Sequence, residues 1–187
     1  NNTAVGKSAG LAVTTGADNT AVGTSALTTN ITGANNVAMG VSALKLNTAS
    51  NNTALGRGAL LDNTTGTRLV AVGPNALGNN TTAAYNIAVG FNALFVNTVG
   101  TGNVAVGDSA LYLNTGSNNT AVGSFNGSIL PALYNNTSGG NNIAVGTGAL
   151  AANTTASQNT AVGYQSLFAN TTAGTNVAVG YQAMYAN

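Results

Sequence analysis

A triplet of Ala, an aliphatic residue and Gly returns eleven times along this 187-residue chain. Successive triplets are 16 or 17 residues apart, with one interval of 23. The closing glycines are Gly6, Gly23, Gly40, Gly56, Gly73, Gly90, Gly107, Gly123, Gly146, Gly163 and Gly180. A short period that runs from end to end indicates a fold built from one copied unit, so the repeat constrains the architecture more than local propensities do. We therefore predict one rod-shaped domain over residues 1–187.

The unit is too short for a helical repeat, because a pair of helices needs about 33 residues or more. Each unit instead holds a short β-branched segment between an Asn-Thr turn and a Gly, a pattern typical of β-strands. We predict an all-β fold, a parallel β-solenoid (β-roll) of about eleven coils of 16–17 residues. We further expect several such chains to lie side by side in a homotrimer.

The alanine of the triplet is present in every unit. Side chains of a strand alternate between two faces, so the residues that flank this alanine share one face, and the alanine occupies the other. We predict that the flanking aliphatic face and a Leu column further along the unit form the core. A column fixed at Ala indicates close approach of another backbone, either a neighbouring chain, which we favour, or a tight bend of the same coil. The alanines assigned to inter-chain packing are Ala38, Ala54, Ala71, Ala88, Ala105 and Ala121.

Two asparagine columns complete the unit. Asn bonds readily to its own turn, and stacked amides can bond one another at the ~4.8 Å spacing of adjacent strands. We predict two Asn ladders, one before the strand and one after the Leu column. The first comprises Asn2, Asn19, Asn36, Asn52, Asn86, Asn103, Asn119, Asn142, Asn159 and Asn176, with Leu69 as its exception. The second comprises Asn30, Asn47, Asn63, Asn80, Asn97, Asn114, Asn136, Asn153, Asn170 and Asn187, with Val13 as its exception.

The single long interval follows Gly123 and equals one ordinary unit plus six residues. We place an inserted loop at residues 124–131, with Asn126-Gly127 as its turn signal. Insertions in repeat proteins often map to a binding face. A tolerated surface insertion is the alternative.

Aromatic side chains gather in two variable columns, one just after the glycine and one just after the Leu. Exposed aromatic stripes can stack on sugars or dock a partner; the alternative is that they seal neighbouring coils. The candidate ligand or partner surface comprises Phe91, Phe95, Tyr112, Phe125, Tyr134, Tyr164, Phe168, Tyr181 and Tyr185.

Charged residues make up 4% of the chain and the formal net charge is +1, so there is no electrostatic reason to bind nucleic acid. No apolar run approaches the ~20 residues that span a bilayer, and we predict no membrane insertion. The chain has no His, Cys or Glu, and Asp18, Asp62 and Asp108 lie in separate units. That is too sparse for paired-carboxylate or metal chemistry. We predict a protein that is not an enzyme, with no catalytic residue, no cofactor and no metal site.

The Asn-Thr-Ala-Val-Gly pentads resemble the Asn-x-Val-Ala-Ile-Gly repeats of trimeric autotransporter adhesin heads. The longer unit Asn-Thr-Ala-Val-Gly-Tyr-Gln-Ser-Leu-Phe-Ala-Asn-Thr-Thr, at 159–172, also resembles repeats of phage and virus tail-fibre proteins. The resemblance covers essentially the whole chain, although these coils are longer than those of adhesin heads. It implies a left-handed parallel β-roll in a threefold bundle, with the Ala-Val strand toward the bundle.

We therefore expect a structural and adhesive fibre segment, from a surface adhesin or a phage tail fibre. It would be extracellular, on a cell surface or a virion, and part of a longer fibre. Its partners would be copies of itself, in a homotrimer or a filament, and a cell-surface glycan or receptor. Two alternatives stay open: a self-assembling extracellular filament subunit, and an ice-binding β-solenoid. The second is motivated by the Thr column Thr48, Thr64, Thr81, Thr98, Thr115, Thr137, Thr154 and Thr171.

Overall fold

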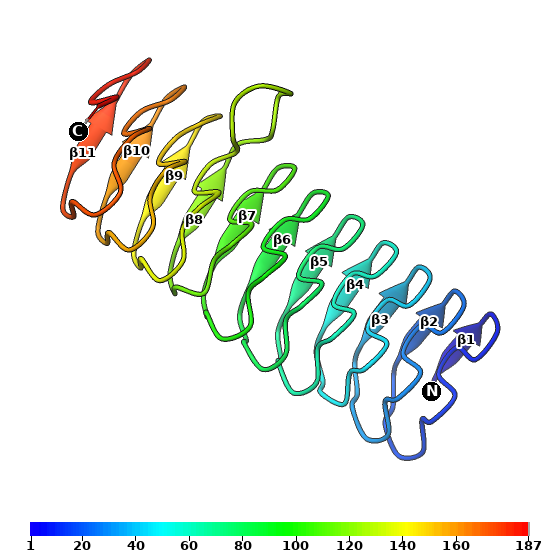
Figure 1. Cartoon of the computed structure of the whole chain (residues 1–187). Helices are drawn as coiled ribbons and strands as arrows, with labels where there is room; N and C mark the ends of the chain where they lie inside the picture. Colours follow the sequence, from blue (N-terminus) through cyan, green and yellow to red (C-terminus); the bar gives the residue numbers. More distant parts are fainter. Residues whose placement is uncertain (187) are drawn as a thin grey trace.

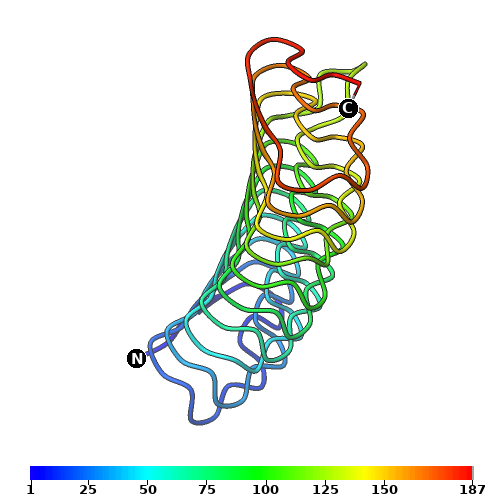
Figure 2. The same ribbon diagram turned by 90° about the vertical axis from the view of Figure 1, so that its left-hand side faces the viewer.

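The computed structural model describes residues 1–186, which form eleven three-residue strands and no helix. The strands are β1 (Thr3–Val5), β2 (Thr20–Val22), β3 (Val37–Met39), β4 (Thr53–Leu55), β5 (Val70–Val72), β6 (Ile87–Val89), β7 (Val104–Val106), β8 (Thr120–Val122), β9 (Ile143–Val145), β10 (Thr160–Val162) and β11 (Val177–Val179). They make one sheet in chain order, and every neighbouring pair is parallel (Figure 1). The predicted all-β parallel solenoid is confirmed. Figure 2 shows the coils stacked into a curved rod.

The strand register is constant although the interval between units is not. Ala88 pairs with Ala105 across an ordinary interval. Ala121 pairs with Ala144 across the interval of 23, and Figure 1 shows the extra residues leaving the stack as a loop between β8 and β9. A slip of one residue would turn every side chain of a strand to the other face. Insertions and deletions are therefore confined to the turns.

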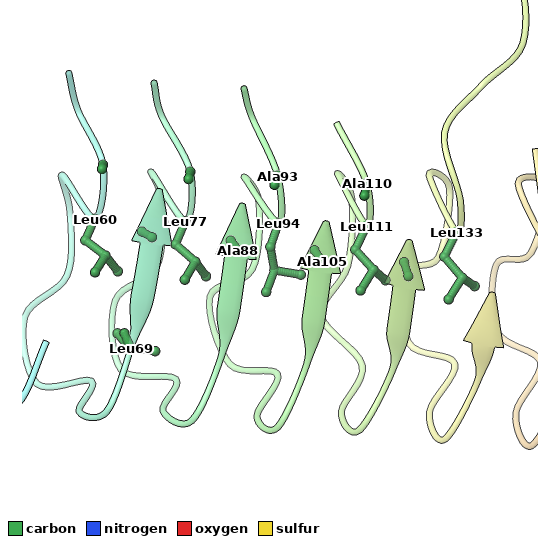
Figure 3. Packing of buried hydrophobic residues seen from close by; sticks show 14 of the residues in the cluster. Leu60, Leu69, Leu77, Ala88, Ala93, Leu94, Ala105, Ala110, Leu111 and Leu133 are labelled. Carbon is green, nitrogen blue, oxygen red and sulfur yellow. The ribbon is translucent and has the colours of Figure 1, made fainter. Parts of the chain in front are cut away.

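The central alanine of every strand from β2 to β11 is buried in the interior, which corrects our assignment of the two faces; Ala4 of β1, in the terminal coil, is exposed. Ala38, Ala54, Ala71, Ala88, Ala105 and Ala121, which we assigned to inter-chain packing, are all fully buried in the core of their own chain. The flanking Val, Ile and Thr residues point outward instead. Figure 3 shows the reason: a row of leucines, including Leu94 and Leu111, fills the thin coil behind the strands. The space left opposite the leucines admits only a methyl group.

The Leu column enters the core through an unfavourable backbone conformation. Leu94 and Leu111 both have φ of 54°, in the left-handed region, and both are completely buried. That region costs a non-glycine residue about 1–2 kcal/mol, whereas burial of a Leu side chain gains about 1.5–3 kcal/mol. The sharp corner is thus tolerated because it delivers the largest fully buried side chain of the coil to the interior.

The glycine of the triplet is required by coil stacking. Gly73 has φ of 127°, and a Cβ placed on it would lie 2.5 Å from the carbonyl oxygen of Gly90 in the next coil. A side chain at this column would therefore push the coils apart in the ten units that another coil follows; Gly180, in the last coil, has no such contact but keeps φ of 130°.

The two predicted Asn ladders are present inside the coil. Asn119 and Asn136, one from each ladder, are fully buried, and their Nδ2 groups donate to the same carbonyl oxygen, that of Gly139, at 2.8 and 2.9 Å. Asn136 Nδ2 also donates to Asn114 Oδ1 at 2.6 Å, and Asn119 Oδ1 accepts from the backbone N–H of Asn142 at 3.0 Å. Asn136 thus joins its own turn to the preceding coil, and Asn119 bonds the following coil at two points. Asn187, the last member of the predicted second ladder, lies outside the described residues.

Candidate functional site

The outward side of the strands is a narrow apolar surface, which we call the sheet face. It consists of the first and third residues of each strand, and no strand contains a charged residue. Its more exposed apolar members are Val5, Val37, Met39, Leu55, Ile87, Val89, Val106, Val122, Ile143, Val145, Val177 and Val179. This surface was not predicted from the sequence, because these residues were assigned to the core.

The sheet face is continuous because the strands are in register. At about 4.8 Å per strand, eleven strands extend for roughly 50 Å. Ile87 and Val89, in the middle of the sheet, are 40% and 36% exposed. Soluble monomers rarely expose contiguous apolar patches above a few hundred Å², and larger ones mark interaction sites. The sheet face is therefore a candidate surface for contact with another macromolecule.

Seven of the nine predicted aromatic residues stack on one another between coils. The rings of Phe95, Tyr112 and Tyr134 form one column, with centroids 5.5 and 5.3 Å apart. The other stacked pairs are Tyr164–Tyr181 at 5.3 Å and Phe168–Tyr185 at 5.1 Å. Stacking between coils is the alternative that the sequence left open, and it accounts for most of the aromatic columns.

The two remaining aromatics, Phe91 and Phe125, line a cavity of about 390 Å³ next to the inserted loop. We call this cavity the loop pocket. Its complete lining is Phe91, Asp108, Ser109, Phe125, Leu130 and Tyr134. The predicted aromatic surface therefore divides into stacked columns and a pocket, with Tyr134 belonging to both.

Three successive coils build the loop pocket. Phe91 and Asp108 directly follow the glycines of adjacent units, so they lie in one column, while the loop contributes Phe125 and Leu130. The Phe125 N–H donates to the backbone oxygen of Asp108 at 3.2 Å, which ties the start of the loop to the neighbouring coil. Ser124 Oγ accepts from the Asp108 N–H at 3.1 Å.

The tip of the loop is shaped by its own Asn-Gly turn, as the sequence predicted. Asn126 Oδ1 accepts from the backbone N–H groups of Ser128 at 3.2 Å and Ile129 at 2.8 Å. Such a side-chain-to-backbone turn fixes a short loop without contacts from elsewhere. At the end of the loop, Pro131 is buried where the chain rejoins the stack.

Asp108 is the charged residue of the loop pocket. It is half-buried, and its Oδ1 accepts from Ser109 Oγ at 2.7 Å. Within residues 1–186, Oδ2 makes no hydrogen bond to the protein and no basic group forms an ion pair with Asp108. In the sequence, Asp108 was weighed only for paired-carboxylate and metal chemistry, and neither was predicted. Its position one unit after Phe91 was the sequence signal that could have placed it in this pocket.

The remaining residues show little chemistry. Among residues 1–186, no three His, Cys, Asp or Glu side chains come together as a metal site would require. Over the same range there is also no helix that could cross a membrane.

Fold and surfaces together define the class of the chain: a repeat-built parallel β-solenoid with an apolar sheet face and a pocket beside an inserted loop. No protein-family model, curated protein or solved structure matches it. Its function is therefore inferred from these surfaces and from the resemblance of its repeats.

Proposed function

We propose that the chain is a segment of a structural and adhesive fibre, in which three copies lie side by side with their sheet faces toward a common axis. The observation that carries this proposal is the uncharged, in-register row of exposed Val, Ile, Leu and Met residues on one side of the rod. A polar shaft of Asn, Thr, Ser and Gly turns would then cover the outside of the fibre.

Burial of the sheet face supplies the driving force for association. Apolar area removed from water contributes about 25 cal/mol per Å², and every strand adds the same two outward columns to the contact. A two-chain sandwich would cover the same face. The resemblance of the pentads to trimeric adhesin heads favours threefold packing, and it also supports an extracellular location on a cell or virion. Inter-chain contacts would then be made by the residues that flank the strand alanines, such as Val89 and Val106.

Oligomeric state is the direct test. Sedimentation equilibrium at micromolar concentration should give three times the mass of the chain. Val89→Lys combined with Val106→Lys should shift the protein to monomer, because each subunit would have to bury unpaired charges. The matched control is Thr65→Lys with Thr82→Lys, which adds the same charge at exposed turn positions and should leave the trimer intact. A monodisperse wild-type monomer would refute the trimer, and long unbranched fibres in electron micrographs would favour the filament alternative.

Ice binding is the second candidate, because the sheet face is uncharged and regularly spaced along the rod. The Thr column that first suggested it is less suitable. The hydroxyls of Thr48 and Thr64 already donate to the carbonyl oxygens of Thr64 and Thr81, both at 2.9 Å. Thermal hysteresis from a monomeric protein would support ice binding over the fibre, and its absence would remove this candidate.

A further inference from the structure

The lining of the loop pocket differs chemically from the repeating surface of the described residues. The rest of the surface is dominated by Asn, Thr, Ser and Gly turns and by the β-branched sheet face, whereas the pocket gathers aromatic rings around one carboxylate. Phe91 and Phe125 are each 47% exposed, unlike Phe95 and Tyr112, which are half-buried in their stack. Within residues 1–186 neither of these two rings stacks on another aromatic ring, which leaves their exposed faces available to a ligand.

Asp108 gives the pocket a negative charge that no basic group of the described chain balances. Its backbone N–H is held by Ser124 Oγ and its Oδ1 by the Ser109 hydroxyl, so the carboxylate is fixed in position with Oδ2 unused. Beside apolar walls a charge interacts more strongly than it does in open water. The pocket is therefore arranged to attract a cation.

The hydrogen-bonding groups of the lining restrict which cation fits. The Ser109 hydroxyl already donates its proton to Asp108 Oδ1. The side chains of Asp108 and Ser109 can therefore only accept hydrogen bonds from a ligand. A sugar could donate hydroxyl protons to the Asp108 carboxylate, but the Tyr134 hydroxyl is the one remaining side-chain donor of the lining, so several sugar oxygens would lie against Leu130 and the phenyl rings without a donor. A quaternary ammonium group carries positive charge on apolar methyl groups and needs no hydrogen bond. Aromatic faces bind such groups through cation–π attraction.

We propose that the loop pocket binds a quaternary ammonium group, with a choline-type trimethylammonium as the ligand class. Phe91, Phe125 and Tyr134 provide aromatic walls, Leu130 an apolar wall, and Asp108 the counter-charge. This assignment deepens the adhesive part of the proposed function and rests on it for its biological setting. The pocket itself is built by one chain and shares no residue with the strands.

Isothermal titration calorimetry with choline chloride tests the assignment. Choline should bind at one site per chain, and 3,3-dimethylbutan-1-ol, which has the same shape without the charge, should bind at least about tenfold more weakly. Asp108→Asn keeps the shape of the side chain and should weaken choline binding by about tenfold. Phe125→Ala should have an effect of similar size.

The matched control is Asp62→Asn, which removes the same charge from a unit without the pocket and should leave choline affinity unchanged. Circular dichroism melts should show that all variants fold as the wild type does. Equal binding of the neutral alcohol, unchanged affinity in Asp108→Asn, or binding of galactose in place of choline would each overturn the assignment. Choline binding should also persist in the monomeric Val89→Lys/Val106→Lys protein, so failure of the trimer and failure of the pocket can be told apart; its loss there would contradict a pocket built by one chain.

Discussion

The interior of each coil and the sheet face are made from neighbouring residues of the same strand, yet they obey different rules. Inward columns hold Ala, Leu and Asn almost without exception, whereas outward columns alternate among Thr, Val, Ile, Leu and Met. Every inward residue must fit both its own coil and the coils before and after it. Within their own chain, outward residues need only suit a flat β surface. A column that keeps one residue type in nearly every unit therefore indicates packing within this chain. A column that accepts several residue types indicates a surface.

Enlarging the inward alanines should have the largest effect. Ala88→Leu with Ala105→Leu places two isobutyl groups where the Leu column leaves room for methyl groups, and overpacking costs about 1–3 kcal/mol per site. We expect the melting temperature to fall sharply or folding to fail, as read by circular dichroism. Val89→Leu with Val106→Leu, which ends in the same two side chains on the outward side, should change the melting temperature little. Equal effects from the two pairs would contradict the assignment of faces.

Breaking an Asn ladder should cause the second-largest loss of stability. Asn119→Leu removes the bond to the Gly139 carbonyl and leaves the N–H of Asn142 without its acceptor. Each buried unsatisfied group costs about 1–3 kcal/mol, so chemical denaturation should show a loss of roughly that size for each lost partner.

The chain offers its own comparison for this variant. Leu69 already occupies the same column, is fully buried, and gives no side-chain oxygen to the next coil. Leu69→Asn should therefore be tolerated, with a change in unfolding free energy within about 1 kcal/mol, because the new amide restores bonds while apolar burial is lost. A destabilisation as large as that of Asn119→Leu would show that Leu69 packing, rather than ladder continuity, governs this coil.

Removal of one hydroxyl at the outer turn should have a modest effect. Thr64→Val eliminates the 2.9 Å bond from Thr64 Oγ1 to the Thr81 carbonyl oxygen, at a position that is half-buried. A net hydrogen bond is worth about 0.5–1.5 kcal/mol, and solvent can replace part of it here. Urea denaturation should place the loss near the lower end of that range, and Thr65→Val, whose hydroxyl is exposed, is the matched control.

Deletion of residues 126–131 should affect stability least and ligand binding most. It joins Phe125 to Ala132 and restores the ordinary 17-residue interval between Gly123 and Gly146. Because β8 and β9 are already in register, we expect the unfolding free energy to change by less than about 1 kcal/mol, since loop length has a weak effect on stability. Choline binding should be lost along with Leu130. A collapse of stability would show that the loop supports the stack.

Much of the fold could be read from the columns, because a stacked repeat turns sequence alignment into spatial proximity. The one-sheet order, the constant register and the Asn ladders all follow from the period, as the Asn119–Asn142 contact illustrates. Phe95, Tyr112 and Tyr134 stack for the same reason, since each follows the Leu of its unit. Only part of the loop pocket could be predicted from the sequence. The column after the glycine places Asp108 beside Phe91, but the sequence does not show how the inserted loop folds over these two residues.

Sequence alone determined the period, the division into strand and turn, and which residues share a face. Only the tertiary structure decided which face is inside, because Ala and its aliphatic neighbours are both apolar and hydrophobicity cannot rank them. Volume decided it. A coil this narrow, already filled by Leu94 and its equivalents, accepts the methyl of Ala88 and leaves Ile87 and Val89 outside.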